Sequence, residues 1–472
     1  MKADLTRDTF APDRHYARVI QQQGRVPLDA DWNEQAEIQA HHDETETIDV
    51  IGPAGFPIGP SFLLSVSPDK TDVLIGDGTG YVNGILAENT HRQCDVIAFP
   101  AAGQLQLRTL VLDGIALRAG EWLQPSDPTS PSTSLPPVRI QTVDPTTQII
   151  TLATSPSFPA NLVVERIASY LIQPDWYAPD LATFAPPALP ALASDGVYLA
   201  YLDVWRRHVT ALEDPHLREV ALGGPDTATR AKTVWQVKLQ AIAEGSPVDC
   251  TTPLPTEPST GQLSARARQP ASGDSPCVIT PTARYRSLEN QLYRVEIHDP
   301  GALDTATFKF SRDNGMVLTS WLGSSGADLS VGSLGKDKVL GFAAGQWIEL
   351  IDDSLEEAGA PGTLAKIANV DPATNTITID TTTVYPAPSP STRGYDITKY
   401  PLNPRIRRWD YVSATAALSV TQPSGDGYLD LEQGVQVRFE AGYYATGDYW
   451  LIPARTITAD VEWPRNEVGT PL

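Results

Sequence analysis

Two stretches of this 472-residue chain match each other and decide its fold. IALRAGEWL at residues 115–123 aligns with LGFAAGQWI at residues 340–348, and both contain Ala-Gly-x-Trp. Further along, VDPTTQIITL at 143–152 aligns with VDPATNTITI at 370–379. The first pair is offset by 225 residues and the second by 227, so the second copy carries two extra residues between its motifs, as a loop insertion would.

Each copy predicts the same short β structure. Asp-Pro opens a type I turn, because proline presets φ at the second turn position. The pattern predicts a strand with a tryptophan anchor, then a variable loop and a closing hairpin. This arrangement is typical of a small β-barrel or sandwich that occurs twice in the chain. The expected fold is therefore mainly β: several small β-sandwich or β-barrel modules, one of them duplicated, after an N-terminal arm and one helix.

Composition agrees with short strands and excludes several classes of protein. The chain has 41 prolines and 34 glycines, a density that breaks long helices and excludes a helical bundle. Its 35 Lys and Arg against 57 Asp and Glu give a net charge of −22, which argues against nucleic acid or anionic lipid as the main partner. The three cysteines form no CxxC pair, so neither a zinc site nor a disulfide framework is indicated. The opening MKADLTRDTF lacks the apolar core of a signal peptide, and no direct insertion into a membrane is expected.

One amphipathic helix is predicted near the N-terminus, from about Trp32 to about Asp49. Asp31 followed by Glu34 indicates a capping box, and Gly52-Pro53 ends the helix. Its apolar positions are sparse, namely Trp32, Ala36 and Ile48. Such a thin stripe predicts packing against another subunit or against the body of the protein, with Trp32 buried there.

Composition shifts suggest six segments along the chain. Period-two alternation at 293–298 indicates a half-exposed strand, whereas 197–205 is apolar on both faces and indicates a central strand. The expected segments are an N-terminal docking arm and helix (1–52), a β module with the first copy (53–165), a central sheet segment (166–246), a Pro/Ser/Thr-rich loop or linker (247–276), a β module with the second copy (277–400) and an aromatic-rich β segment (401–472).

Motifs of common catalysis are missing from the sequence, so no catalytic residue, cofactor or metal ligand is predicted. IGDGTG at 75–80 precedes a strand and is interpreted as a hairpin turn rather than a phosphate cradle. The densest titratable cluster, at 203–214, is interpreted as charges flanking a strand, with Arg206 and Arg207 as ion-pair partners. Asp352 and Asp353 with Glu349 have the carboxylates that calcium prefers, but the spacing of an EF-hand is missing, so they are interpreted as a solvated turn.

Aromatic residues near the C-terminus suggest a binding surface. Exposed aromatics bind sugar rings or partner proteins, although packing in the core of a small β domain is the favoured explanation for each residue taken singly. The candidate contacts with a glycan or partner are Tyr443, Tyr444, Tyr449 and Trp450.

Several segments together resemble a bacterial family of uncharacterised proteins. The opening carries its signature, QQGRVPLDADWNEQ at 22–35, in which Pro27 stands where members more often have a polar residue. The other similar segments are YLDVW at 201–205, VALGGPDTATR at 220–230, FKFSRDNG at 308–315 and GDYWLIPAR at 447–455.

The resemblance implies a structural protein rather than an enzyme. Members look like components encoded beside phage-tail-like contractile injection systems, which implies a baseplate- or fibre-associated subunit that docks through its N-terminal arm. The implied partners are other particle subunits (baseplate, sheath or spike proteins) and further copies of this chain, with a trimer as the first expectation. Assembly in the cytoplasm is implied, on a particle that becomes extracellular after release. The alternative is a glycan-binding or glycan-cleaving tip protein. The candidate docking residues are Arg7, Phe10, His15, Tyr16, Arg25, Leu28, Asp29, Asp31, Trp32, Asn33 and Glu34.

Overall fold

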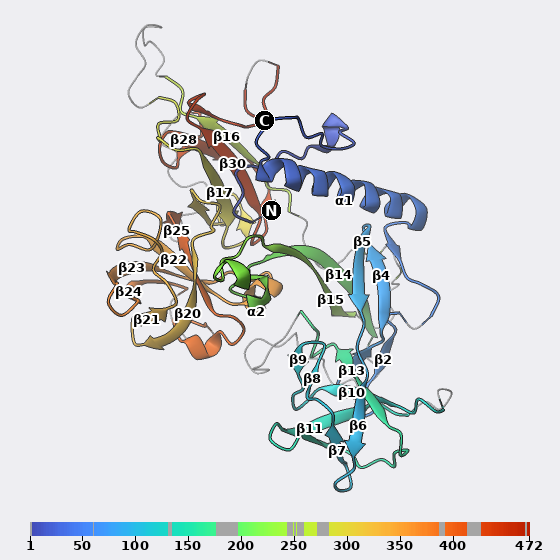
Figure 1. The fold of residues 1–472 in the computed structure, drawn as a ribbon. Coiled ribbons are helices and arrows are strands. Elements are labelled where there is room, and N and C mark those ends of the chain that lie inside the picture. The colour runs from blue at the N-terminus through green and yellow to red at the C-terminus, as the bar shows by residue number, and fades with distance from the viewer. Residues whose placement is uncertain are drawn as a thin grey trace. The chain divides into compact units, whose positions relative to one another are not determined.

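A computed structural model of the chain is mainly β (Figure 1). It describes residues 2–59, 61–130, 135–175, 197–242, 249, 252, 259–270, 283–386, 392–412, 426–467 and 470–472. The chain divides into two compact units: unit 1 contains 1–41, 208–231 and 255–472, and unit 2 contains 42–207 and 232–254. No helix in the described part is both long and apolar enough to cross a membrane.

The predicted N-terminal helix exists, but its cap and its anchors differ from the prediction. Helix α1 covers Asp29–Ile51, and the Asp31 carboxylate accepts the backbone N–H of Leu28 at 3.4 Å. Asp31 is therefore the third residue of the helix and its carboxylate reaches back to the residue before the helix. The predicted capping box assigned that position to Glu34. Trp32, Ala36 and Ile48 are all exposed, and the buried residues are instead Ala30 and Ile38. The expectation that Trp32 packs on the body of its own chain is wrong.

The first copy of the repeat lies in a closed six-stranded barrel in unit 2. Its ring order is β10-β11-β12-β7-β6-β13, closed by pairing of β13 with β10. The core is aliphatic, with Leu105, Leu123 and Ile150 among its buried residues. The strands are β6 (Cys94–Ala98), β7 (Gln104–Leu107), β10 (Trp122–Ser126), β11 (Val138–Asp144), β12 (Ile149–Leu152) and β13 (Val163–Ser169).

The second copy lies in another closed six-stranded barrel, in unit 1. Its ring order is β22-β23-β24-β21-β20-β25, the same order as in the first barrel when strands are matched along the chain. The internal repeat predicted from the sequence is thereby confirmed as a duplicated barrel. The strands are β20 (Leu318–Ser325), β21 (Asp328–Val331), β22 (Trp347–Ile351), β23 (Thr363–Asp371), β24 (Thr376–Tyr385) and β25 (Arg405–Trp409).

Matched backbone contacts show that the two barrels are built alike. Gly120 and Gly345 have φ values of 94° and 88°. Their N–H groups donate at 2.8 Å to the carbonyls of Ile140 and Ile367. Positive φ explains glycine at both positions, since other residues adopt it at a cost.

A separate layer of unit 1 carries the C-terminal strands. A five-stranded sheet, β26-β19-β17-β30-β31, packs with a three-stranded sheet, β16-β28-β27, over one core that includes Tyr293, Phe308 and Tyr444. The strands are β16 (Leu263–Ala267), β17 (Gln291–Ile297), β18 (Gly301–Ala302), β19 (Phe308–Ser311), β26 (Tyr411–Val412), β27 (Leu429–Asp430), β28 (Val435–Phe439), β29 (Tyr443–Tyr444), β30 (Tyr449–Arg455) and β31 (Asp460–Val461). Strand β16 falls within the expected 247–276 loop, most of whose other residues lie outside the described part.

The remaining strands include a long hairpin. β14 (Val197–Val209) pairs only with β15 (Arg230–Ile242) among the described residues, and most of its side chains are half-buried or exposed. The central position predicted for 197–205 is therefore wrong: apolar residues on both faces do not require a neighbour on each edge. The other strands are β1 (Ala54–Gly55), β2 (Leu64–Val66), β3 (Val73–Ile75), β4 (Gly78–Val82), β5 (Ile85–Asn89), β8 (Val111–Leu112) and β9 (Ile115–Ala116). The remaining helices are η1 (Pro12–Arg14), η2 (Pro215–Leu217), η3 (Val220–Leu222), α2 (Asp353–Glu357) and η4 (Ile397–Lys399).

Candidate functional site

The first residues of the chain are fixed inside unit 1. Lys2 Nζ lies 3.0 Å from Glu296 Oε2 and 5.0 Å from the centre of the Tyr449 ring. Ala3 is buried, and its carbonyl accepts a hydrogen bond of 2.5 Å from the Asn314 side-chain amide. Burial lowers the pKa of Lys2, and the Glu296 carboxylate opposes that shift. The N-terminal residues are thus part of the packed structure.

Lys2 meets a buried charged cluster that joins the five-stranded sheet to the second barrel. Lys309 Nζ on β19 lies 2.6 Å from Glu349 Oε1 on β22 and 3.3 Å from Glu296 Oε1 on β17. Trp409 Nε1 donates to the other Glu349 oxygen at 2.8 Å. Every one of these side chains except Lys2 is at least nine-tenths buried. We call Arg294, Glu296, Lys309, Glu349 and Trp409 the charged cluster.

The alternation of β17 explains how the cluster forms. Tyr293, Val295 and Ile297 face the apolar core, so Arg294 and Glu296 project from the opposite face. The prediction of a half-exposed strand is wrong, because the polar face is also buried. Glu296 pairs across the sheet with Lys309, which supplies the opposite charge directly beside it. Gly315 completes the arrangement, since a Cβ there would collide with the Arg294 guanidinium.

Charges within the cluster compensate one another. Burial by itself raises the pKa of Glu349, but Lys309 lowers it to about 2. Glu296 behaves alike: Lys2 and Arg294 overcome burial and hold its pKa well below the usual range. Burial lowers the pKa of the neighbouring His298 to about 4, an effect that Lys309 reinforces. The carboxylates stay ionised and paired, so the cluster holds the five-stranded sheet and the second barrel together through ion pairs rather than exchanging protons.

A second group of carboxylates has the spacing of a metal site. Ligand oxygens of Glu213, Asp353 and Glu356 lie within 4.8 Å of one another. Arg405 already places its guanidinium among them, 2.7 Å from Glu356 and 3.6 Å from Glu213, and it also pairs with Asp353. The arginine therefore supplies the positive charge that a metal ion would otherwise bring.

The interpretation of Asp352, Asp353 and Glu349 as a solvated turn is wrong, because all three are buried. Asp352 caps α2 by accepting the N–H of Leu355 at 3.1 Å, and it pairs with Arg393 at 2.7 Å. Sequence alone predicts a surface position for these carboxylates, because it does not reveal the buried partners that they meet in the fold.

The charges at 203–214 serve separate local contacts. Asp203 pairs with Lys238 at 2.5 Å, and Asp214 caps η2 through the N–H of His216 at 3.0 Å. Arg206, expected to pair within this stretch, instead lies 2.5 Å from Glu44. None of these contacts assembles a catalytic group.

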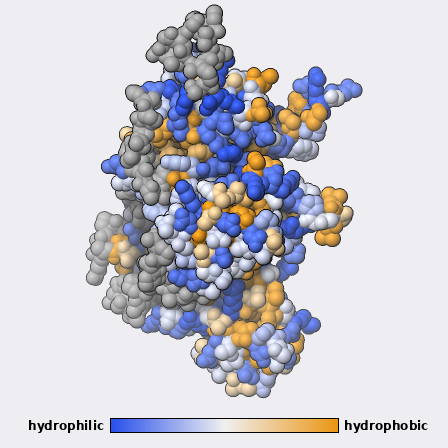
Figure 2. Space-filling model, turned by 90° about the vertical axis from the view of Figure 1, so that its left-hand side faces the viewer, coloured by the Kyte–Doolittle hydropathy of each residue, from blue (hydrophilic) through white to orange (hydrophobic). Residues whose placement is uncertain are grey.

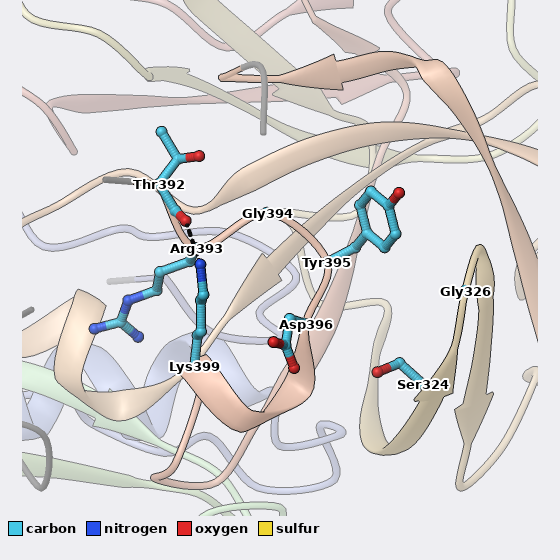
Figure 3. A pocket seen from close by; sticks show the side chains of 8 residues that line it. All are labelled: Ser324, Gly326, Thr392, Arg393, Gly394, Tyr395, Asp396 and Lys399. Carbon is cyan, nitrogen blue, oxygen red and sulfur yellow. Dashed lines mark hydrogen bonds between the residues drawn. The ribbon is translucent and has the colours of Figure 1, made fainter. Parts of the chain in front are cut away.

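A small hollow of about 300 Å³ lies beside η4 in the second barrel (Figure 3). Its two cations are already engaged: Lys399 Nζ donates to the Thr392 carbonyl at 2.9 Å, and Arg393 pairs with Asp352. The hollow therefore lacks the charge needed to hold an anionic ligand.

The candidate docking residues fall into two groups. In the first, Thr6 donates to Asp29 through its backbone N–H at 2.9 Å, and Thr9 donates to Glu34 at 2.6 Å. Arg7 lies 3.7 Å from Glu462, and the Phe10 ring packs near His41 with centroids 5.7 Å apart. The first group, which makes contacts inside unit 1, is Arg7, Phe10, Asp29, Asp31 and Glu34.

The second group lies at the surface, together with two residues that the sequence did not single out. Ile20 and Val26 are 72% and 81% exposed, and Trp32 is 68% exposed. The sequence could have indicated these two residues, because apolar side chains within the otherwise polar stretch 20–28 have no core of their own to pack into. Figure 2 shows hydrophobic residues reaching the surface among hydrophilic ones on the face it draws. The exposed candidates are His15, Tyr16, Arg25, Leu28, Trp32 and Asn33.

The four C-terminal aromatics do not form one surface. Tyr444 is fully buried in the core beside Phe439, and Trp450 packs against the same core. Tyr443 is half-buried, and Tyr449 is partly exposed next to Lys2. A groove of about 900 Å³ runs between the N-terminal arm and β30 and is lined by Asp8, Phe10, Tyr449, Trp450, Glu462 and Trp463, among others.

Comparison with known proteins gives one match. The model of a family of unknown function (DUF6519) matches residues 1–107, 189–251 and 253–471. The unmatched stretch, 108–188, contains β8 to β13 and thus four of the six strands of the first barrel. No curated protein and no solved structure matches the chain.

Proposed function

For this chain, which belongs to the family of unknown function DUF6519, we propose the role of a structural, non-enzymatic component of a phage-tail-like contractile injection particle. In this proposal it is associated with the baseplate or fibre and docks on other particle subunits through its N-terminal segment. Resemblance of the opening signature to proteins encoded beside such systems supports the particle. The mainly β architecture and the paired, buried charges support a structural role.

One observation carries the docking proposal: apolar side chains are exposed on a segment anchored at both ends. Residues 2–10 are fixed by contacts such as that of Lys2 with Glu296, and α1 begins at Asp29. Between these anchors the chain exposes apolar residues whose burial would contribute about 25 cal/mol per Å² of apolar area. We define the docking segment as residues 15–34; its exposed apolar residues are Tyr16, Ile20, Val26, Leu28 and Trp32.

Anchoring makes this segment better suited to binding than a free tail of the same composition. Thr9 bonds to Glu34, and the Val19 N–H donates to Gln35 at 2.8 Å, so the segment is folded back on the first turns of α1. A segment held in place before binding loses less conformational entropy on docking. Contiguous exposed apolar residues mark protein contact sites more often than scattered ones do.

The test compares surface variants for co-sedimentation with particles. Tyr16→Ala combined with Trp32→Ala removes two large exposed side chains, and we expect at least a tenfold loss of particle-bound protein. Leu288→Ala, at a site that is 97% exposed, is the matched control and should sediment like the wild type. Equal sedimentation of the double variant and the wild type would show that the segment does not dock.

Point variants are preferable to deletion of residues 1–49. That deletion removes Lys2 and leaves Glu296 with one fewer cation in a buried site. Loss of one partner from a buried ion pair costs about 3–5 kcal/mol, so the truncated β body would be destabilised as well as undocked. Surface substitutions leave the charged cluster intact.

We also propose that Trp32 lies in a contact between copies of the chain, with a trimer as the first expectation. Closed symmetric assemblies are the common solution for repeated subunits. Light scattering should show an oligomer for the wild type and a smaller species for Trp32→Ala. A monomer for both proteins would leave only assembly on the particle.

The groove beside β30 favours glycan binding as the second candidate function. Tyr449, Trp450 and Trp463 line it together with the carboxylates of Asp8 and Glu462. Aromatic faces and carboxylates are the groups that bind sugar rings. A glycan array and a reducing-sugar assay on cell-wall material test this candidate, and silence in both would eliminate it.

A further inference from the structure

Unit 2 brings one histidine and three carboxylates together from four loops and strands. His91 follows β5, Asp77 connects β3 to β4, Asp113 lies in the turn between β8 and β9, and Glu165 is on β13. None of them belongs to the docking segment or to the charged cluster.

Asp113 sets the orientation and the tautomer of His91. One Asp113 oxygen accepts the backbone N–H of Arg92 at 3.1 Å, and the other lies 3.1 Å from His91 Nδ1. Because a carboxylate only accepts hydrogen bonds, Nδ1 carries the proton, and the neutral ring has its lone pair on Nε2. Asp113 and Gly114 have φ values of 54° and 81°, which place the carboxylate at the tip of a tight turn.

The lone pair on His91 Nε2 points into a buried and negatively charged place. The His91 side chain is 6% exposed, and Nε2 has no hydrogen-bond partner among the described residues. Its nearest charged neighbour is Asp77 Oδ1 at 4.0 Å, which is too far for a hydrogen bond. Two electron-rich atoms that face each other in this way repel unless a metal ion, a proton or a water molecule lies between them.

Asp77 is held in place, and its charge is not balanced. The buried Asn89 amide donates to the Gly76 carbonyl at 3.0 Å, and Gly78, at φ 142°, packs so closely on Ser61 that no Cβ fits. Among the described residues, Asp77 makes no ion pair with a lysine or an arginine, and the nearest group that can become cationic is the His91 ring.

We propose that His91 Nε2 and the Asp77 carboxylate bind a divalent transition-metal ion of the Zn²⁺ class, with Asp113 as the positioning residue. Imidazole and carboxylate are ligands for such ions, and a histidine that binds metal usually donates its other N–H to a carboxylate, as His91 does to Asp113. Bonds of about 2.1 Å at a tetrahedral angle put two ligand atoms about 3.4 Å apart. Shortening the 4.0 Å distance between His91 Nε2 and Asp77 Oδ1 to that value requires only a small movement of the partly exposed Asp77 side chain.

A protonated His91 bridging Asp113 and Asp77, or a water molecule between the two side chains, is the competing arrangement. Neither would select Zn²⁺ over Mg²⁺, whereas an imidazole ligand does, because Mg²⁺ prefers oxygen ligands.

The test is calorimetric titration of the full chain, freed of metal by chelation, with Zn²⁺ and with Mg²⁺. We expect one Zn²⁺ per chain and no Mg²⁺ binding at the same concentration. His91→Gln and Asp77→Asn should each weaken Zn²⁺ binding at least tenfold, and Asp113→Asn about 10–100-fold. Asn tolerates positive φ, so Asp113→Asn keeps the turn.

His216→Gln, at an exposed histidine of η2, is the matched control and should bind like the wild type. Circular dichroism establishes that each variant is folded. Absence of Zn²⁺ binding by the wild type, or equal affinity of the wild type, His91→Gln and Asp77→Asn, would overturn the proposal.

Discussion

The two barrels share a ring order, but they differ in what they place at matching positions. Strand pairing sets Gln124 opposite Glu165 in the first barrel and Glu349 opposite Arg407 in the second. Two residues further along the same strands, Ser126 is paired with Val163 in the first barrel, whereas Ile351 is paired with Arg405 in the second. The second barrel alone therefore carries buried charges at these positions, where it meets the charged cluster. Buried charges at these positions are therefore not needed to form the barrel and are a feature of the second copy alone.

Other matching positions are alike and identify what the fold needs. Arg166 in the first barrel and Arg408 in the second occupy equivalent pairs, opposite Leu123 and Ile348. Each buried guanidinium donates to two carbonyls of the loop that precedes the Gly-x-Trp motif, at 3.2 and 3.1 Å for Arg166 and at 2.9 and 2.6 Å for Arg408. These arginines tie the loop to the barrel, and no short motif in the sequence marked them.

The largest expected effect tests the charge difference between the barrels. Glu349→Ala leaves Lys309 buried without its closest anion, which costs about 3–5 kcal/mol. Gln124→Ala, the matched change in the first barrel, removes a side chain that donates to the Leu135 carbonyl at 2.7 Å, and it costs about 1 kcal/mol. Urea unfolding measures both. Similar losses of unfolding free energy in the two variants would mean that the buried charges in the second barrel stabilise it no more than a neutral hydrogen bond does.

The pH dependence should differ in direction between the units. His298 has a pKa of about 4 when folded, so the unfolded chain takes up a proton first as pH falls, and unit 1 loses stability from about pH 7 to pH 4. Against an unfolded pKa of about 6.5, this amounts to about 2 kcal/mol between pH 8 and pH 5. Hydrogen exchange of β17 and β19 at the two pH values measures it.

Asp77 gives unit 2 the opposite contribution. Its folded pKa of about 6 is raised, so the folded form holds the proton more tightly, and stability falls as pH rises from about 4 to about 6. Asp77→Asn should remove this dependence, and His298→Gln should remove that of unit 1. Exchange that changes in the same direction in both units, and in both variants, would contradict the assignment.

A smaller effect tests the structural equivalence of the barrels. Gly120→Ala and Gly345→Ala each force alanine to positive φ, which costs about 1–2 kcal/mol. No atom lies closer than 3.8 Å to a Cβ at Gly120, and none lies within 4 Å at Gly345, so only the backbone conformation should matter. Thermal unfolding should show nearly equal losses. A large difference between the two losses of stability would mean that the two turns are not structurally equivalent.

The smallest effect concerns the cation beside each repeat tryptophan. Arg139 lies 5.7 Å from the centre of the Trp122 ring, and Lys366 lies 5.2 Å from that of Trp347. Lys366→Met should cost about 0.5–1 kcal/mol. Arg139→Met should cost more, because Arg139 also donates to the Gly120 carbonyl at 3.1 Å and pairs with Asp69 at 3.2 Å. Chemical denaturation of the two variants checks the order, and the reverse order would contradict it.

Much of the fold was predictable, whereas little of the charged cluster was. The repeat predicted the duplicated module, and Gly52 correctly marked the end of α1. In contrast, Glu296, Lys309 and Glu349 come from three different strands, Glu349 lies 40 residues beyond Lys309, and no sequence spacing connects them. His91, Asp77 and Asp113 were overlooked for the same reason.

The sequence by itself determined the alternation of side chains, the turns and the duplication, because each depends on residues within a few positions of one another or on direct comparison of two segments. Only the tertiary structure decided which polar faces are covered. The polar face of β17 is buried because strand pairing and the second barrel bring Lys309 and Glu349 to it, and the N-terminus adds Lys2. Trp32 shows the converse: an aromatic residue on a helix is expected inside, but it stays exposed because no part of the described chain packs over it. Burial is a property of neighbours, and neighbours are set by contacts far apart in the chain.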